Sequence, residues 1–187
     1  MITRTVSLLL AGAALLPLAA QAQQQIVPAQ SEIVFTSRQM GVPVEGRFKS
    51  FSAQVAFDPA KLATSKIGFS VDTGSADISR EANAELPKAV WFNVAQFPKA
   101  TFTSSSIKRL DATRYEVAGK LAIKGVSSDV VVPVTLAQSG GTTTATGSFP
   151  IKRLSFRIGE KEWADTSMVA DEVQVKFKIA LTGVGKL

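Results

Sequence analysis

The chain has 187 residues, with 21 basic and 15 acidic side chains, and it contains neither cysteine nor histidine. Without these two residue types it has no disulfide, no Ser-His or Cys-His nucleophile pair, and no usual zinc or copper site. The charges alternate along the chain instead of forming runs, so we expect a solvated, mildly basic surface and no nucleic-acid partner.

The first 22 residues have the pattern of a secretory signal peptide. A single basic residue, Arg4, precedes an apolar run from Val6 to Ala20, which ends in Ala20-Gln21-Ala22. This run is shorter than the roughly 20 residues that a membrane span requires, and polar glutamines follow it directly. We therefore expect cleavage after Ala22, export, and a mature chain of residues 23–187 that suits a single domain.

Beyond the signal peptide, apolar and polar residues alternate, which predicts strands with one dry and one wet face. Ile33 and Phe35 begin the series, and a change of step between Phe48 and Phe51 predicts a bulge or bend. In chain order, the predicted strands cover residues 32–36, 51–57, 67–71, 100–107, 115–123, 130–136, 145–151 and 173–181.

One segment departs from this alternation and predicts a short helix between strands, over Ser79 to Trp91. Ser79 can cap its first turn, Glu81 and Glu85 are spaced one helical turn apart, and Pro87 allows a break. The apolar residues that follow need a surface to cover, so the helix could lie as a lid across one end of the fold.

About eight short antiparallel strands with one helix predict an all-β sandwich or closed barrel. Small residues on the dry faces, Ala53, Gly119, Ala145 and Gly147, can leave a lumen in a barrel of this size. Phenylalanines from opposite strands could equally fill those gaps and give a packed core. The alternation alone does not choose between these two interiors.

Five linked motifs resemble the YceI-like family of periplasmic proteins, and the resemblance runs from about residue 26 to residue 182. The motifs are Gly46-Arg47-Phe48-x-x-Phe51, Phe57-Asp58-Pro59, Phe92-Asn93-Val94-x-x-Phe97-Pro98-x-x-Thr101-Phe102, Gly119-x-Leu121-x-Ile123-x-Gly125-Val126 and Ile151-x-Arg153-x-x-Phe156-x-Ile158-Gly159, together with Asp171-Glu172-Val173.

The resemblance implies a lipocalin-like antiparallel β-barrel whose apolar lumen binds and carries a polyisoprenoid, a polyprenyl phosphate, an isoprenoid quinone or a similar long-chain lipid in the periplasm. It implies a binding protein with no cofactor and no metal, transient contact with a membrane, and a monomer or homodimer. The chain departs from the family at Lys124, where histidine is common, at Asn93, where aspartate is common, and in a shorter segment before the helix.

Candidate ligand-binding residues are the aromatic side chains of the lumen and lid. Taken one by one, each fits a packed core better than a ligand wall, but Trp91, Phe92, Phe97 and Phe102 flank the predicted lid and are the stronger candidates. The set comprises Phe35, Phe51, Phe57, Phe69, Trp91, Phe92, Phe97, Phe102, Phe149, Phe156 and Phe177.

A phosphate head group would need fixed cations, and Arg153 and Arg157 are the candidates. The interpretation that we favour is two solvated arginines of a loop. A quinone would need no cation, since hydroxyl groups would suffice.

Two other functions stay open. A packed barrel would suit a non-catalytic envelope stress or interaction protein. The acidic residues Glu160, Glu162 and Asp165 could in principle do acid and base work, but three acids in a glycine-containing loop are typical of a solvated turn. Trp163, which lies among them, is expected to anchor this loop on the barrel. We therefore expect no catalytic residue.

Overall fold

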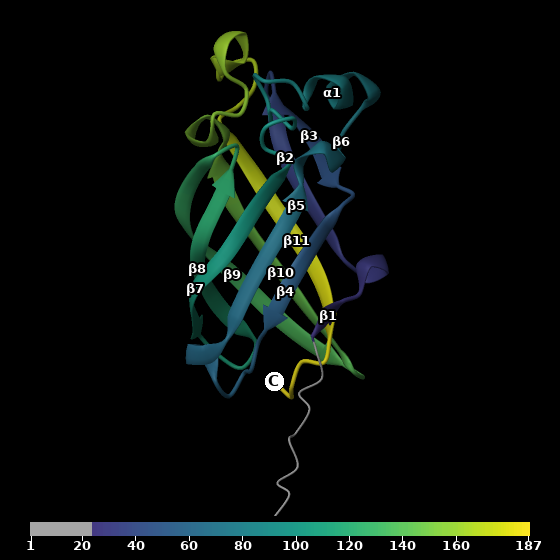
Figure 1. Ribbon diagram of the computed structural model, residues 1–187, viewed down its shortest axis with the longest axis vertical. Coiled ribbons are helices and arrows are strands. Elements are labelled where there is room, and N and C mark those ends of the chain that lie inside the picture. Colours follow the sequence, from purple (N-terminus) through teal and green to yellow (C-terminus); the bar gives the residue numbers. More distant parts are fainter. Residues whose placement is uncertain (1–23) are drawn as a thin grey trace, which may run out of the picture.

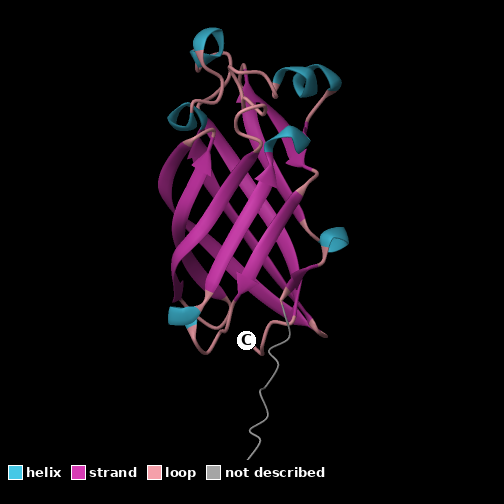
Figure 2. Cartoon of the chain, viewed as in Figure 1, coloured by secondary structure: helices cyan, strands magenta, loops and turns pink. Residues whose placement is uncertain are grey.

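The computed structural model describes residues 24–187, so the predicted signal peptide and its cleavage site lie outside the described residues. The described part of the chain forms an eleven-stranded antiparallel sheet with one α-helix (Figures 1 and 2). None of its helices is long and apolar enough to span a membrane.

The elements follow one another along the chain with short connections. The strands are β1 (Gln25–Ile26), β2 (Glu32–Gln39), β3 (Val42–Phe48), β4 (Phe51–Ala56), β5 (Lys66–Asp72), β6 (Ala76–Asp77), β7 (Lys99–Arg109), β8 (Arg114–Ile123), β9 (Val126–Ser139), β10 (Thr142–Lys152) and β11 (Glu172–Thr182). The α-helix is α1 (Arg80–Glu85), and short 3-10 turns lie at Pro28–Gln30, Leu62–Thr64, Thr73–Ser75, Arg153–Phe156 and Lys161–Ala164.

The strand pairings close the sheet into a barrel, because β3 and β4 act as one long strand with a bend between them. β3 pairs with β2 on one side and with β6 on the other, and β4 pairs with β5. At the break between them, the Lys49 N–H donates to Ser75 O over 3.1 Å, and Asp72 N–H donates to Ser50 O over 2.9 Å. This bend is the one predicted between Phe48 and Phe51.

When a bent pair of consecutive strands is counted as one strand, the barrel has the eight strands that the sequence predicts. β3 with β4 counts as one strand and β5 with β6 as a second, and the other six are β2, β7, β8, β9, β10 and β11. The short strand β1 pairs only with β11. The all-β antiparallel barrel is therefore confirmed. β3 itself was not predicted, because Pro43 and Gly46 interrupt its alternation.

The predicted helix is present but shorter than its expected range. Ser79 Oγ accepts a hydrogen bond from the Ala82 N–H over 3.2 Å, so Ser79 caps α1 as expected. The helix ends at Glu85, two residues before Pro87, and turns carry the chain on to Phe97.

The two ends of the barrel are closed differently. At one end, drawn at the top of Figure 1, α1 and the segment between β10 and β11 cover the opening. At the other end lie β1 and the chain after β11. There Val184 and Leu187 pack against a cluster of Phe57, Tyr115 and Leu136. We call residues 183–187 the tail.

Candidate functional site

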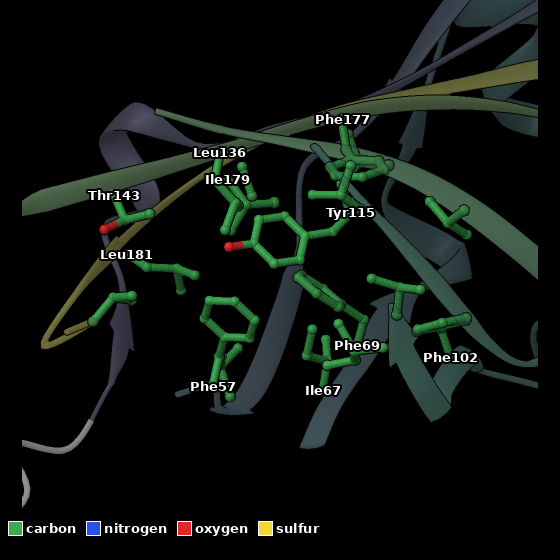
Figure 3. Close-up of a pocket in the computed structure, with 18 of the residues that line it drawn as sticks. Phe57, Ile67, Phe69, Phe102, Tyr115, Leu136, Thr143, Phe177, Ile179 and Leu181 are labelled. Atoms are coloured by element: carbon green, nitrogen blue, oxygen red, sulfur yellow. The ribbon is translucent and has the colours of Figure 1, made fainter. Parts of the chain in front are cut away.

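Two cavities lie end to end inside the barrel. The tail-end cavity has a volume of about 160 Å³, and Leu136 and Thr143 are among the residues that line it (Figure 3). Val184 of the tail lines it as well. The helix-end cavity has a volume of about 400 Å³ and reaches α1 and Trp91. Phe149 and Val175 line both cavities, so they mark the point where the two meet.

The walls of the lumen are apolar side chains that the fold leaves partly uncovered. Phe69, Phe102, Phe149 and Phe177 all line the tail-end cavity, yet each is only half-buried. An inward-facing ring that stays half-buried has unfilled space beside it. Such surface gains free energy when an apolar molecule covers it, about 25 cal/mol per Å².

Most of the aromatic residues that the sequence nominates face this lumen. Phe57, Phe69, Phe102 and Phe177 line the tail-end cavity, Phe35, Trp91 and Phe92 line the helix-end cavity, and Phe149 lines both. The other three lie elsewhere. Phe51 packs beside Ile33 and Ile179, Phe97 covers Gly125 in the β8–β9 turn, and Phe156 belongs to the core under the helix end.

The inward-facing glycines do not open space in the lumen, although the sequence suggested that they could. A β-carbon at Gly119 would lie 2.5 Å from Cζ of Phe102, and one at Gly147 would lie 2.3 Å from Cζ of Phe177. The rings from neighbouring strands therefore occupy the space over both glycines. The cavities exist beside these rings and not because of the glycines.

The helix end is the polar end of the lumen. Among the residues that line this cavity are Ser37, Gln39, Ser79, Glu81 and Glu85. The side chains of Glu81 and Glu85 come from α1, and Glu85 forms an ion pair with Lys88. Arg153 is the only basic residue among the described residues that line either cavity.

Arg153 holds together the segment between β10 and β11, residues 153–171, which we call the cap. It is 2% exposed, and its guanidinium donates five hydrogen bonds to backbone carbonyl oxygens. Nε donates to Ala170 O, Nη1 to Ile158 O and Gly159 O, and Nη2 to Trp163 O and Val169 O, over 2.6–3.0 Å.

An arginine has five N–H donors, so all of those of Arg153 are used. The predicted head-group role of Arg153 therefore finds no free donor in this arrangement. Arg157 is exposed and forms an ion pair with Glu160 at 3.0 Å. Burial lowers the pKa of Arg153, with the Asp171 carboxylate acting in the opposite direction.

Lys124 ties the β8–β9 turn to this cap. Its side chain is 4% exposed, and Nζ donates to Arg157 O and, over 3.0 Å, to Glu160 Oε2. The Lys124 ammonium, followed by the Arg157 guanidinium, holds the pKa of the Glu160 carboxyl below its usual range. The backbone N–H groups of Gly159 and Glu160 both donate to Val90 O, which joins the cap to the segment after α1.

Two of the acidic residues of the cap are held by neighbouring side chains. Glu160 is held by Lys124 and Arg157, and Asp165 accepts hydrogen bonds from Ser167, its own turn partner. Within residues 24–187, no cluster of three metal-binding side chains is present. Trp163 packs on Trp91, with ring centroids 5.3 Å apart, which fits the predicted anchoring of this loop.

Three buried polar atoms have no hydrogen-bond partner within the described residues: Ser37 Oγ, Trp91 Nε1 and Tyr115 Oη. Ser37 and Trp91 line the helix-end cavity, and Tyr115 lines the tail-end cavity. Tyr115 begins the strand predicted over residues 115–123, but it was not among the candidate residues named from the sequence. Its signal was available, since it is the single tyrosine and its hydroxyl stands on a face that is otherwise apolar.

Known proteins resemble this chain in both sequence and structure. The model of the YceI-like domain matches residues 24–181. The YceI proteins of Salmonella arizonae and Salmonella newport are each 33% identical over 96 residues, which are 51% of this chain and 50% of theirs. The chain therefore spans about half the length of the curated relatives it matches.

Among solved structures, BcnA of Burkholderia cenocepacia is 46% identical, with a TM-score of 0.80 over 83% of this chain and 99% of that one. A polyisoprenoid binding domain from Saccharophagus degradans shares the fold at 15% identity, with a TM-score of 0.70 over 86% of this chain and 98% of that one. From the match of the domain model over most of its length, the chain belongs to the YceI-like family.

Proposed function

We propose that this protein binds a polyisoprenoid or another long-chain lipid in its lumen and carries it in the periplasm, without catalysing a reaction. The observation that carries the proposal is the pair of apolar cavities that meet at Phe149 and Val175. Together they offer an elongated path, and the half-buried rings along it would be covered by a flexible hydrocarbon chain. Each buried CH₂ contributes about 0.8 kcal/mol.

The charge distribution of the lumen favours a neutral lipid over a polyprenyl phosphate. Arg153, the basic residue in the lining, has already given all its donors to carbonyl oxygens. Glu81 at the helix-end rim would repel a phosphate, whereas Glu85 is already paired with Lys88. An anionic head group would therefore lose its hydration without gaining a cation.

An exposed apolar rim beside the helix end supports transient membrane contact. Met40 is 72% exposed, Val42 62% and Met168 46%, and the Met40 N–H donates to Met168 O over 2.9 Å, which holds the two methionines in neighbouring turns. We name Met40, Val42 and Met168 the rim patch. Side chains of this kind can enter the headgroup region of a bilayer, so a lipid could pass between membrane and lumen there.

The alternative, a packed barrel that acts only through its surface, draws support from the rings that cover Gly119 and Gly147. Extraction of the purified, exported protein with organic solvent, followed by mass spectrometry, separates the two. The carrier proposal expects a long-chain lipid in near-stoichiometric amount. After delipidation, geranylgeraniol should raise the melting temperature by mass action. A protein that yields no lipid and whose melting temperature does not respond would leave the packed barrel as the better account.

A further inference from the structure

Both methionines that follow the predicted signal peptide lie in the rim patch. The chain has three methionines and no cysteine, and the third methionine is Met1. Met40 lies in the β2–β3 turn at the helix end of the barrel (Figure 1), and Met168 lies in a turn of the cap. The backbone joins these two turns, since the Met40 N–H donates to Met168 O and Gln39 forms a β-bridge with Val169. One small surface therefore carries both sulfur atoms.

Packing does not account for a methionine at either position. Both side chains are exposed, and in the part of the chain that the structure describes neither lines the lumen nor belongs to a core cluster. Met40 also has a φ of +48° and precedes Gly41, whose φ is +81°. In a hairpin turn of this kind Asn-Gly is the usual pair, because asparagine tolerates the left-handed backbone. A long thioether thus stands where a smaller polar residue would suit the turn better.

An exposed thioether reacts with a peroxide without a catalyst. A sulfur lone pair attacks one oxygen of hydrogen peroxide, the O–O bond breaks, and the second oxygen leaves as water with the proton of the first. The sulfur loses two electrons and becomes a sulfoxide. A methionine sulfoxide reductase reverses the step, with a dithiol oxidised to a disulfide and water released. The side chain changes from apolar to polar, and the backbone is unaltered.

We propose that Met40 and Met168 form a paired oxidation site, and that their conversion to sulfoxides by a peroxide switches off the membrane contact of the rim patch. The membrane part of this inference rests on the proposed function. Among the exposed large apolar side chains of residues 24–187, these two are the ones that carry sulfur, and Val42 is the other member of the patch. A sulfoxide is polar and resists entry into the apolar part of a bilayer, so Val42 alone would be left to enter it.

Oxidation should leave the barrel folded, because the turns under the rim patch are held by backbone groups that sulfoxide formation does not touch. The Ala170 N–H donates to Arg38 O over 2.9 Å, and Nη2 of Arg153 donates to Val169 O over 2.7 Å. Val169 itself is buried. A switch therefore differs from general oxidative damage, since it changes membrane contact while the melting temperature stays the same.

The test treats the delipidated, exported protein with hydrogen peroxide. Peptide mass spectrometry should find one added oxygen on Met40 and one on Met168. Flotation with neutral phosphatidylcholine vesicles should then recover roughly 10-fold less protein, because two apolar anchors are lost. The melting temperature should not change. Methionine sulfoxide reductases for both sulfoxide epimers should restore flotation.

The matched variant, Met40→Leu with Met168→Leu, keeps an apolar surface but offers no sulfur. Its flotation should be the same before and after peroxide, whatever its starting value. The switch would be overturned if either methionine took up no oxygen, if flotation of the fully oxidised parent were unchanged, or if the leucine variant lost flotation to the same extent. A fall in the melting temperature of the oxidised parent would also overturn it, since this would indicate damage.

Two further measurements separate this inference from the proposed function. Should the untreated parent not float with vesicles, the proposed membrane contact would fail and the switch with it, while uptake of geranylgeraniol from solution would still test the lumen. Should the parent float and respond to peroxide but take up no lipid, the carrier role would fail and the oxidation switch would stand.

Discussion

The ring of Phe177 fills the space over Gly147, so that a β-carbon at residue 147 would lie 2.3 Å from Cζ of Phe177. The same β-carbon would lie 2.5 Å from the carbonyl oxygen of Pro133 on β9. A side-chain ring can turn aside, but a backbone carbonyl within a sheet cannot move without loss of pairing. The wall of the barrel is therefore packed to its limit here, although the lumen beside Phe177 is open.

Gly147→Ala should accordingly destabilise the fold by about 1–3 kcal/mol, the usual cost of overpacking. Gly141→Ala is the matched control, because a β-carbon at Gly141 meets nothing within 4 Å. That control should change stability by less than about 1 kcal/mol. Thermal and denaturant melting of both variants measure the difference. Equal melting of Gly147→Ala and the parent would mean that Phe177 and the strand adjust freely.

The faces of the strands could be predicted from the sequence because each residue's neighbours on the chain decide them. Lys176 is exposed and Phe177 turns to the lumen, as the alternation of β11 predicts. What fills the space over a glycine depends instead on the register of the next strand. Phe102 on β7 reaches over Gly119 on β8, and no local pattern carries that information.

In the candidate site, too, some features follow from the local sequence and others depend on the folded structure. Aromatic residues on dry faces were good candidates for the lumen wall, and eight of the eleven line a cavity. The structural role of Arg153 could not be predicted, because its carbonyl partners come from residues up to 17 positions away in the cap. The unpaired state of Tyr115 also depends on every side chain across the lumen. It is a property of the closed barrel and not of β8.

Arg153→Lys should destabilise the protein by about 3 kcal/mol or more, since an ammonium has three donors and cannot reach the carbonyl oxygens that the planar guanidinium holds. Those oxygens would be left buried and unpaired. Arg157→Lys is the control, because Arg157 is exposed and its change should stay within about 0.5 kcal/mol. Denaturant melting compares the two. A mild effect of Arg153→Lys, joined to a loss of lipid binding, would restore the head-group role for Arg153.

Stability should fall on the acid side through Glu160. Its pKa is lowered in the folded protein from the ordinary value of 4.5, chiefly by the Lys124 hydrogen bond and next by that of Arg157. A lowered folded pKa means that the contribution is complete above pH 4.5 and is lost as the pH falls through the folded value.

Glu160→Gln should therefore lower the melting temperature at neutral pH and flatten its decline below pH 4.5. Glu162→Gln removes the same charge from an exposed neighbour and should keep the parent profile. Melting temperatures measured across the acid range give both curves. Parallel curves for parent and Glu160→Gln would show that the contact with Lys124 does not contribute to acid sensitivity.

The rim patch should control the exchange of lipid with membranes without affecting the lumen. Met40→Asp with Met168→Asp places two carboxylates where apolar side chains would enter the bilayer, so transfer of a fluorescent polyprenol from neutral vesicles should slow several-fold. Leu110→Asp is the control, because Leu110 is 47% exposed at the tail end and has similar exposure to Met168. Neither change touches a residue that lines a cavity, so binding of the same probe added from solution should stay the same. If Leu110→Asp slowed transfer and the rim variant did not, lipid would have to enter at the tail end, beside Tyr115.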